Sequence, residues 1–142
     1  MEQIITRAQI YDLDDIIEID RAIFGNDSRR EYIKKTIHEA RCIVVKKEED
    51  VVAFLTYDTH FFECSFISLV IVSPLERRKG YATSLLEYFV EIAPTDKIFS
   101  STNRSNEIMQ HVFKANGFVE SGIIENLDEG DPELIYFKMK QS

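Results

Sequence analysis

The stretch that decides the fold is Leu69-Val-Ile-Val-Ser-Pro-Leu-Glu-Arg-Arg-Lys-Gly-Tyr-Ala-Thr-Ser84. In it an apolar, strand-like run ends at Ser73 and Pro74, a short basic loop follows, and a helix begins after Gly80. The start of a helix leaves backbone N–H groups without intrahelical acceptors and carries the positive end of the helix dipole. Glycine has no side chain, so the backbone there can approach a ligand closely. The stretch therefore predicts an anion site, particularly for phosphate.

The basic loop adds positive charge through Arg77, Arg78 and Lys79, in a chain whose formal net charge is −8. Two nucleotide-binding loops are excluded by spacing, because the stretch has neither the G-x-x-x-x-G-K-[ST] of a P-loop nor the G-x-G-x-x-G of a dinucleotide loop. An ordinary strand-to-helix turn with solvated basic side chains is the alternative interpretation, and the stretch alone does not decide between the two.

Outward from this stretch, alternating and helical apolar spacings predict the element order β-α-α-β-β-β-α-β-α-β-β. Meandering strands come first and a β-α-β crossover follows, so the sheet should be mixed, in an α/β (α+β) fold. The predicted strands are 2–8, 41–47, 51–59, 64–72, 97–102, 118–124 and 133–140. The predicted helices are 12–24, 28–39, 81–93 and 105–115.

Composition bounds the class of protein. The 142 residues, 44% of them hydrophobic, fit one domain with its own core over 1–142 and argue against disorder. An acidic chain does not suit general nucleic-acid binding, which depends on Lys and Arg. Cys42 and Cys64 lie in apolar runs and are expected to be core residues, not metal ligands or thiol nucleophiles. The sequence shows no secretory leader and no membrane-spanning run, so we expect a cytoplasmic protein without a membrane partner.

The run Arg77-Arg78-Lys79-Gly80-Tyr81-Ala82 resembles the [Q/R]-x-x-G-x-[G/A] loop of the GNAT superfamily of acetyl-CoA-dependent N-acetyltransferases. The later run Asn106-Glu-Ile-Met-Gln-His-Val-Phe-Lys-Ala-Asn-Gly-Phe118 resembles the family's N-x-x-A-x-x-x-Y-x-x-x-G-F segment, with Met109 in place of Ala and Phe113 in place of Tyr. The element order also matches. The resemblance implies a mostly antiparallel central sheet of about seven strands, flanked by about four helices.

The resemblance also implies acetyl-CoA as co-substrate, with no metal. Backbone amides of residues 78–83 would cradle the pyrophosphate, and residues 70–72 would hydrogen-bond the pantetheine arm like an added strand. Asn106 would bind the same arm, and Phe113 would lie near the thioester sulfur. The implied cofactor-binding residues are Val70, Ile71, Val72, Arg77, Arg78, Lys79, Gly80, Tyr81, Ala82, Thr83, Asn106 and Phe113.

The implied reaction is direct attack of a neutral amine on the thioester carbonyl. A backbone N–H near Val72, where the fourth strand parts from the fifth, would stabilise the developing oxyanion. Two positions depart from the family pattern: Phe113 has no proton to donate, and Ser101 stands where some relatives carry a Glu base. The general acid and base are therefore unassigned. The candidates for moving protons are Tyr57, Tyr136, His60 and Glu63.

Acidic residues in the segments that would wall the acceptor site favour a cationic amine, either a small molecule or a peptide. They are Asp27, Glu31, Asp128, Glu129 and Asp131. The alternative is that 126–131 is simply a solvated turn. Two alternatives to an enzyme also stay open: a non-catalytic acetyl-CoA-binding regulatory domain, and an interaction protein that keeps only the fold. The residues do not decide the oligomeric state, for which a homodimer is the prior expectation.

Overall fold

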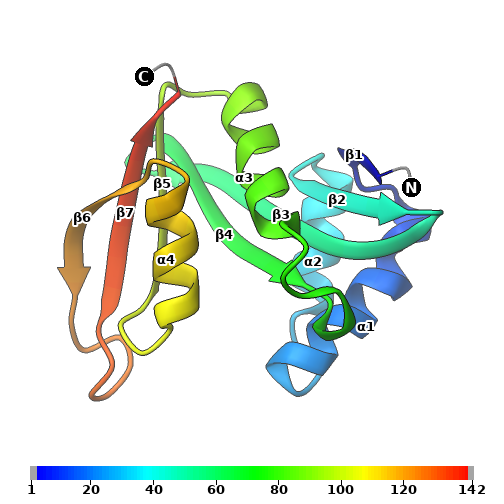
Figure 1. Cartoon of the computed structure of the whole chain (residues 1–142), viewed down its shortest axis with the longest axis horizontal. Coiled ribbons are helices and arrows are strands. Elements are labelled where there is room, and N and C mark those ends of the chain that lie inside the picture. Colours follow the sequence, from blue (N-terminus) through cyan, green and yellow to red (C-terminus); the bar gives the residue numbers. More distant parts are fainter. Residues whose placement is uncertain (1–2, 141–142) are drawn as a thin grey trace. The chain divides into compact units, whose positions relative to one another are not determined.

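The computed structural model describes residues 3–140, and its element order confirms the predicted one (Figure 1). Glu2, which the first predicted strand includes, lies outside the described residues. Short 3-10 turns occupy Ile10–Asp12 and Pro74–Glu76. The strands are β1 Gln3–Arg7, β2 Cys42–Lys47, β3 Asp50–Phe61, β4 Cys64–Val72, β5 Lys97–Asn103, β6 Val119–Ile124 and β7 Glu133–Met139. The helices are α1 Leu13–Phe24, α2 Arg30–His38, α3 Tyr81–Ile92 and α4 Glu107–Ala115.

The seven strands form a sheet in the order β1-β2-β3-β4-β5-β7-β6. β1–β2, β2–β3, β5–β7 and β6–β7 are antiparallel, whereas β4 and β5 run parallel because the α3 crossover joins them. The parallel pairing is short and joins only 65–67 to 98–100. The mixed, mostly antiparallel sheet expected from the family resemblance is confirmed.

The described chain divides into two compact units. Within the described residues, unit 1 comprises those up to 57 together with 69–88, and unit 2 comprises 58–68 together with those from 89 onward. The expectation of one domain over 1–142 stays a prediction.

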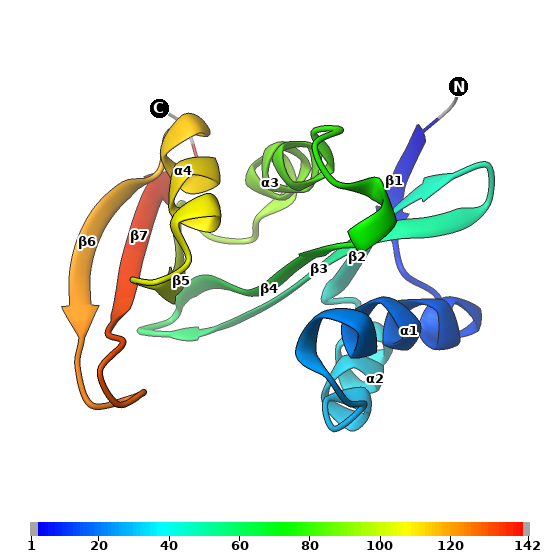
Figure 2. The same ribbon diagram turned by 60° about the horizontal axis from the view of Figure 1, so that its bottom comes forward.

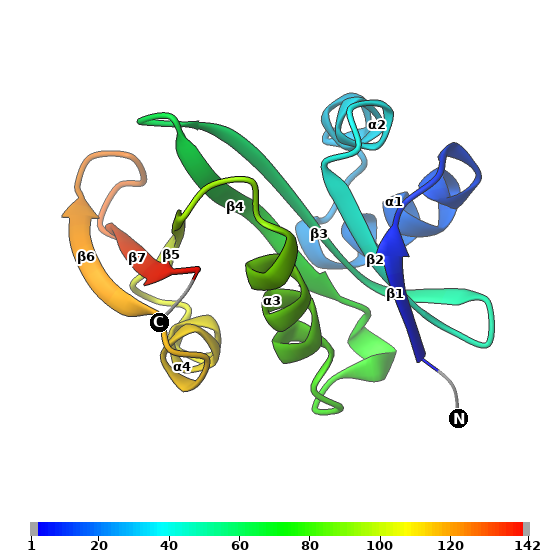
Figure 3. The same ribbon diagram turned by 90° about the horizontal axis from the view of Figure 1, so that it is seen from above.

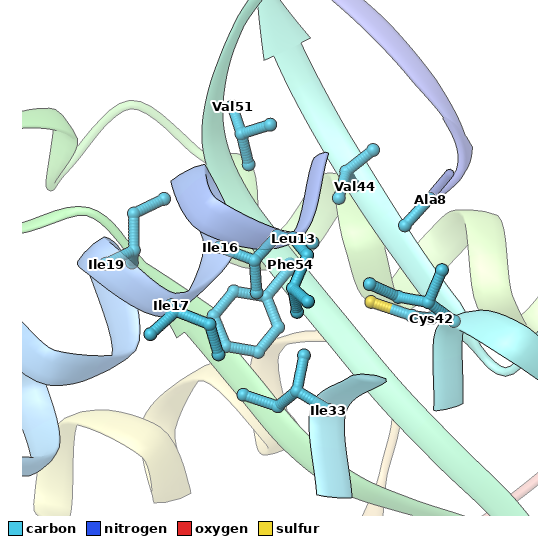
Figure 4. Close-up of a cluster of buried hydrophobic side chains, with 11 residues drawn as sticks. Ala8, Leu13, Ile16, Ile17, Ile19, Ile33, Cys42, Val44, Val51 and Phe54 are labelled. Atoms are coloured by element: carbon cyan, nitrogen blue, oxygen red, sulfur yellow. The ribbon is translucent and has the colours of Figure 1, made fainter. Parts of the chain in front are cut away.

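Unit 1 buries its apolar residues between the α1–α2 pair and the strands. Figure 2 shows α1 and α2 on one side of β1–β3 and α3 on the other. Leu13, Ile16 and Ile17 recur at helical spacing, so they share the face of α1 that points at the sheet. They surround the fully buried ring of Phe54 from β3, together with Ile33 of α2 (Figure 4). This core fixes the strands that lead into the basic loop.

Unit 2 places α4 against β5 and β7 (Figure 3). Alternation along the strands sends Tyr136 toward α4, where its ring stacks on Phe113 at 4.9 Å between centroids. The opposite face of the same strands carries Phe99 and Phe137, whose centroids lie 5.2 Å apart. The two faces of the β5–β7 strands therefore carry different side chains. Those on one face form the core under α4, and the aromatic rings on the other face are half-buried.

The cysteines differ in burial, and the difference predicts their reactivity. Cys42 is fully buried in the unit 1 core, as expected, and desolvation raises the pKa of its thiol to about 12. Cys64 is half-buried at the start of β4. Because the thiolate is the nucleophile, we expect iodoacetamide at pH 8 to modify Cys64 and spare Cys42 in the folded chain. Peptide mass spectrometry after labelling measures this. Equal labelling of both cysteines under native conditions would contradict the burial of Cys42.

Candidate functional site

The basic loop between β4 and α3 has the backbone that its sequence predicts. β4 ends at Val72, and the Ser73 N–H donates a 2.8 Å hydrogen bond to the carbonyl of Val52, which anchors the loop to β3. Arg78 and Gly80 have φ values of 66° and 82°, in the left-handed region that favours glycine. The first hydrogen bond of α3 joins the Ser84 N–H to the Gly80 carbonyl at 3.0 Å. The N–H groups of Tyr81 and Ala82 precede this bond and lie at the positive end of the helix.

The charged side chains of the loop divide into a paired and an unpaired set. Lys79 Nζ lies 3.0 Å from Glu76 Oε1, and Lys47 Nζ lies 3.6 Å from the same oxygen. The hydrogen bond from Lys79 lowers the pKa of Glu76, and the same bond raises the pKa of Lys79. Arg77 and Arg78 are exposed and form no ion pair within residues 3–140. Two guanidinium groups are therefore available to an anion outside the chain.

The loop fits a phosphate-bearing ligand. A Cβ added at Gly80 would meet no atom within 4 Å, so open space lies on that side of the backbone. The start of α3, with its positive helix end, and the two exposed arginines belong to the same short segment as this open space. Of the predicted cofactor residues, 77–83 follow one another in unit 1, on the basic loop and the first turn of α3. Val70, Ile71 and Val72 are half-buried on the part of β4 that leads into it.

Unit 2 contains the other two predicted cofactor residues. Asn106 is exposed and caps α4, because its Oδ1 accepts the Met109 N–H at 3.0 Å, which leaves its amide NH₂ group for other partners. Phe113 is fully buried and packs on Phe118 and Tyr136, with centroids 5.3 and 4.9 Å away. The structure thus gives Phe113 a core role, and its contact with a thioester sulfur stays a prediction.

Tyr136, one of the candidates for moving protons, is fully buried, and its hydroxyl has no hydrogen-bond partner within residues 3–140. Burial raises the pKa of this phenol, with opposing smaller effects from Lys114 and Glu120. The other three candidates differ in their exposure. His60 and Glu63 are exposed near the β3–β4 turn, and Tyr57 is buried and receives a 3.2 Å hydrogen bond from Arg7.

The acidic residues predicted to attract the acceptor fall into two sets. In unit 1, Asp27 is exposed beside Arg21 at 3.5 Å, and Glu31 is exposed on α2. In unit 2, Asp128 accepts from Asn103 Nδ2 at 3.0 Å. Asp131 accepts from both the backbone N–H and the hydroxyl of Ser105 at 3.0 and 2.6 Å, so both its oxygens are engaged.

These contacts show that the 126–131 turn is fastened to the end of β5. The turn interpretation therefore accounts for Asp131, while Glu129 is exposed and free for a cation.

A serine–carboxylate contact in unit 2 joins β5 to β7. The Ser101 hydroxyl on β5 donates a 2.6 Å hydrogen bond to Oε2 of Glu133 on β7. Ser101 stands where some members of the family carry a Glu, and here the neighbouring strand supplies a carboxylate to this position. The contact depends on the cross-strand register that pairs Asn103 with Glu133, and the sequence does not display that register.

Within residues 3–140, no group of three or more His, Cys, Asp or Glu side chains is arranged to hold a metal ion. No helix in the same range has both the length and the apolarity needed to cross a membrane.

Comparison with known proteins identifies the fold. The model of the acetyltransferase (GNAT) family matches residues 10–118. The structure of a GNAT-family acetyltransferase from Bacillus cereus ATCC 10987 is 58% identical, covers 100% of both chains and superposes with a TM-score of 0.97. No curated protein matches the sequence.

More distant structures share the fold at low identity. The ribosomal-protein-S18-alanine N-acetyltransferase of Escherichia coli is 16% identical, covers 99% of this chain and 96% of its own, and has a TM-score of 0.85. The yncA protein of Salmonella typhimurium, solved with its cofactor acetyl-CoA, is 14% identical, covers 99% and 95%, and has a TM-score of 0.81. Both the family match and the 58% identity lead to one conclusion: this chain belongs to the GNAT family of acetyltransferases.

Proposed function

We propose that the chain transfers the acetyl group of acetyl-CoA to a primary amine of a cationic small molecule or peptide. The observation that carries the proposal is the β4–α3 loop, where left-handed Gly80 opens the backbone beside a helix start and two unpaired arginines. This arrangement suits the pyrophosphate of acetyl-CoA, the co-substrate that the family uses.

The roles within the site follow from this arrangement. The N–H groups of 78–83 would hold the pyrophosphate, and the backbone of Val70–Val72 would hydrogen-bond the pantetheine arm. In unit 2, the free amide of Asn106 would bind the same arm, and the buried ring of Phe113 would lie near the sulfur end. The N–H of Val72 would donate to the oxyanion as the amine attacks. No metal is needed in this scheme, because the thiolate is itself a good leaving group.

The amine class rests on charge. Asp27, Glu31, Asp128 and Glu129 are acidic residues that attract a protonated amine toward the protein. The Escherichia coli enzyme named above acts on the alanine of a ribosomal protein, which supports testing peptide amines beside small ones. We further propose a cytoplasmic location, a homodimer as the assembly, and neither nucleic acid nor membrane as a partner.

Isothermal titration with acetyl-CoA, then with CoA, tests the cofactor part of the proposal. We expect dissociation constants in the micromolar range and an increase in melting temperature at saturating ligand. A thiol-release assay with a panel of small amines and peptides then tests the transfer, with acetyl-CoA hydrolysis in the absence of amine as the background.

The outcomes separate the competing functions. Tight binding with amine-dependent thiol release supports the transferase. Tight binding without turnover of any amine favours the regulatory acetyl-CoA-binding domain. Neither binding nor thermal stabilisation would overturn the proposal in favour of an interaction protein.

A further inference from the structure

The parallel pairing between β4 and β5 ends at Ser100, and β5 continues beyond it. Ile67 pairs with Ser100, whose hydroxyl also donates a 2.8 Å hydrogen bond to the Ile67 carbonyl and closes the ladder. Ser101, the next residue, is half-buried and lies on the opposite face of β5 from Ser100. The Ser101–Glu133 pair therefore stands where one edge of β5 becomes free.

Strand register explains how Glu133 reaches this position. Ser101 pairs with Ile135 and Asn103 pairs with Glu133, so all four side chains share one face of the β5–β7 ladder. Glu133 extends diagonally to the Ser101 hydroxyl, which donates to its Oε2 at 2.6 Å. The other carboxylate oxygen has no hydrogen-bond partner within residues 3–140. One oxygen thus fixes the orientation, and the other is available to an external donor.

The position of Glu133 strengthens the interaction of its carboxylate with a cation. Phe99 precedes Ser101 by two residues on the same face, about 7 Å along the strand. Its ring contacts Phe61 and Phe137, with centroids 5.1 and 5.2 Å away, and Phe61 contacts Phe66 at 4.9 Å. Glu133 is half-buried, and a half-buried carboxylate has weaker solvent screening than one on an open turn. Asp131 differs, because Ser105 engages both of its oxygens.

We propose that Glu133 is the general base for the acceptor amine and that Ser101 is its positioning residue, an inference that rests on the proposed acetyl transfer. The carboxylate first takes one proton from the acceptor ammonium. The neutral nitrogen then attacks the thioester carbonyl carbon, so a C–N bond forms and the C–S bond breaks. The nitrogen's second proton passes to the departing thiolate, and Glu133 returns its proton to solvent.

The test compares the wild-type chain with Glu133→Gln, in which the amide oxygen can still accept the Ser101 hydrogen bond. The probes are a lysine-free peptide with a free N-terminus and an N-terminally blocked peptide with one lysine. Their amines have pKa values of about 8 and about 10.4. We expect kcat/KM at pH 6.5 to fall about a hundredfold or more, in the range that general bases contribute. For the free N-terminus the loss should shrink toward pH 9, because that amine is then neutral without help.

Two further variants make the result specific. Glu125→Gln removes the same charge from an exposed position between β6 and β7 and should change kcat/KM less than twofold. Ser101→Ala removes the hydrogen bond that orients the carboxylate. We expect kcat/KM to fall about tenfold, with the same pH dependence as in the wild type. The affinity for acetyl-CoA should stay within twofold in all three variants.

A Glu133→Gln loss that is the same at every pH, or no loss, would overturn the role of Glu133 while leaving the transferase function intact. A wild-type chain that neither binds acetyl-CoA nor acetylates either peptide would instead refute the proposed function itself.

Discussion

Replacing Gly80 by valine is expected to weaken acetyl-CoA binding at least tenfold, which corresponds to about 1.4 kcal/mol. Gly80 has a φ of 82°, and a side chain there would point into the open space beside the first turn of α3. Valine would fill the space that a pyrophosphate needs and would also shift the backbone away from the left-handed region. Isothermal titration of the folded variant with acetyl-CoA measures the loss.

A matched substitution separates the loss of binding from backbone strain. Gly25, after the last residue of α1, has a φ of 100° and likewise meets nothing within 4 Å of an added Cβ. Gly25→Val should therefore lower the free energy of unfolding by about 1–3 kcal/mol, as Gly80→Val should, without changing the affinity for acetyl-CoA. Unchanged affinity in a folded Gly80→Val chain would remove the loop from the cofactor site.

The sequence predicts the fold well because its signals are local. The run of 64–72 and the apolar spacing after Gly80 give β4 and α3 within a residue or two, and Gly117 correctly marks the end of α4. The basic loop is also readable, since a helix start, a glycine and two arginines lie within a few consecutive positions. Local chemistry of this kind needs no knowledge of packing.

What the sequence hides depends on pairing between distant strands. Glu133 reaches Ser101 only because β5 and β7 pair in one particular register. The register between β6 and β7 also shifts between Glu120 and Gly122, which the sequence does not predict. Burial of Phe113 against Tyr136 is likewise a product of packing, as is the engagement of Asp131 by Ser105. The structure of the basic loop was therefore predictable from the sequence, and the proposed base was not.

Breaking the ion pair between Arg29 and Asp20 is expected to destabilise unit 1 by about 3–5 kcal/mol. Asp20 on α1 is 1% exposed, and Arg29, just before α2, donates to it twice, at 3.1 Å from Nε and 2.5 Å from Nη2. The Arg29 guanidinium also lies 4.0 Å from the centre of the Phe24 ring. Arg29→Met keeps most of the side-chain volume but leaves a buried carboxylate without a partner.

The chain provides a close control in the next residue. Arg30 pairs with Asp14 at 3.0 Å, again between α2 and α1, but the Asp14 side chain is 86% exposed. Solvent screens such a pair, so Arg30→Met should cost at most about 1 kcal/mol. Urea titration followed by circular dichroism gives both values from the shift in midpoint.

A third variant identifies the source of the loss. The loss of stability in Arg29→Met comes either from the buried Asp20 carboxylate left without a partner or from the lost contact with Phe24. In the first case, adding Asp20→Leu should restore most of the free energy of unfolding, since an apolar pair can replace a buried ion pair with little loss of stability. In the second case, the double variant would stay as unstable as the single one. Equal effects of Arg29→Met and Arg30→Met would mean that solvent reaches Asp20, and that burial does not distinguish the two pairs.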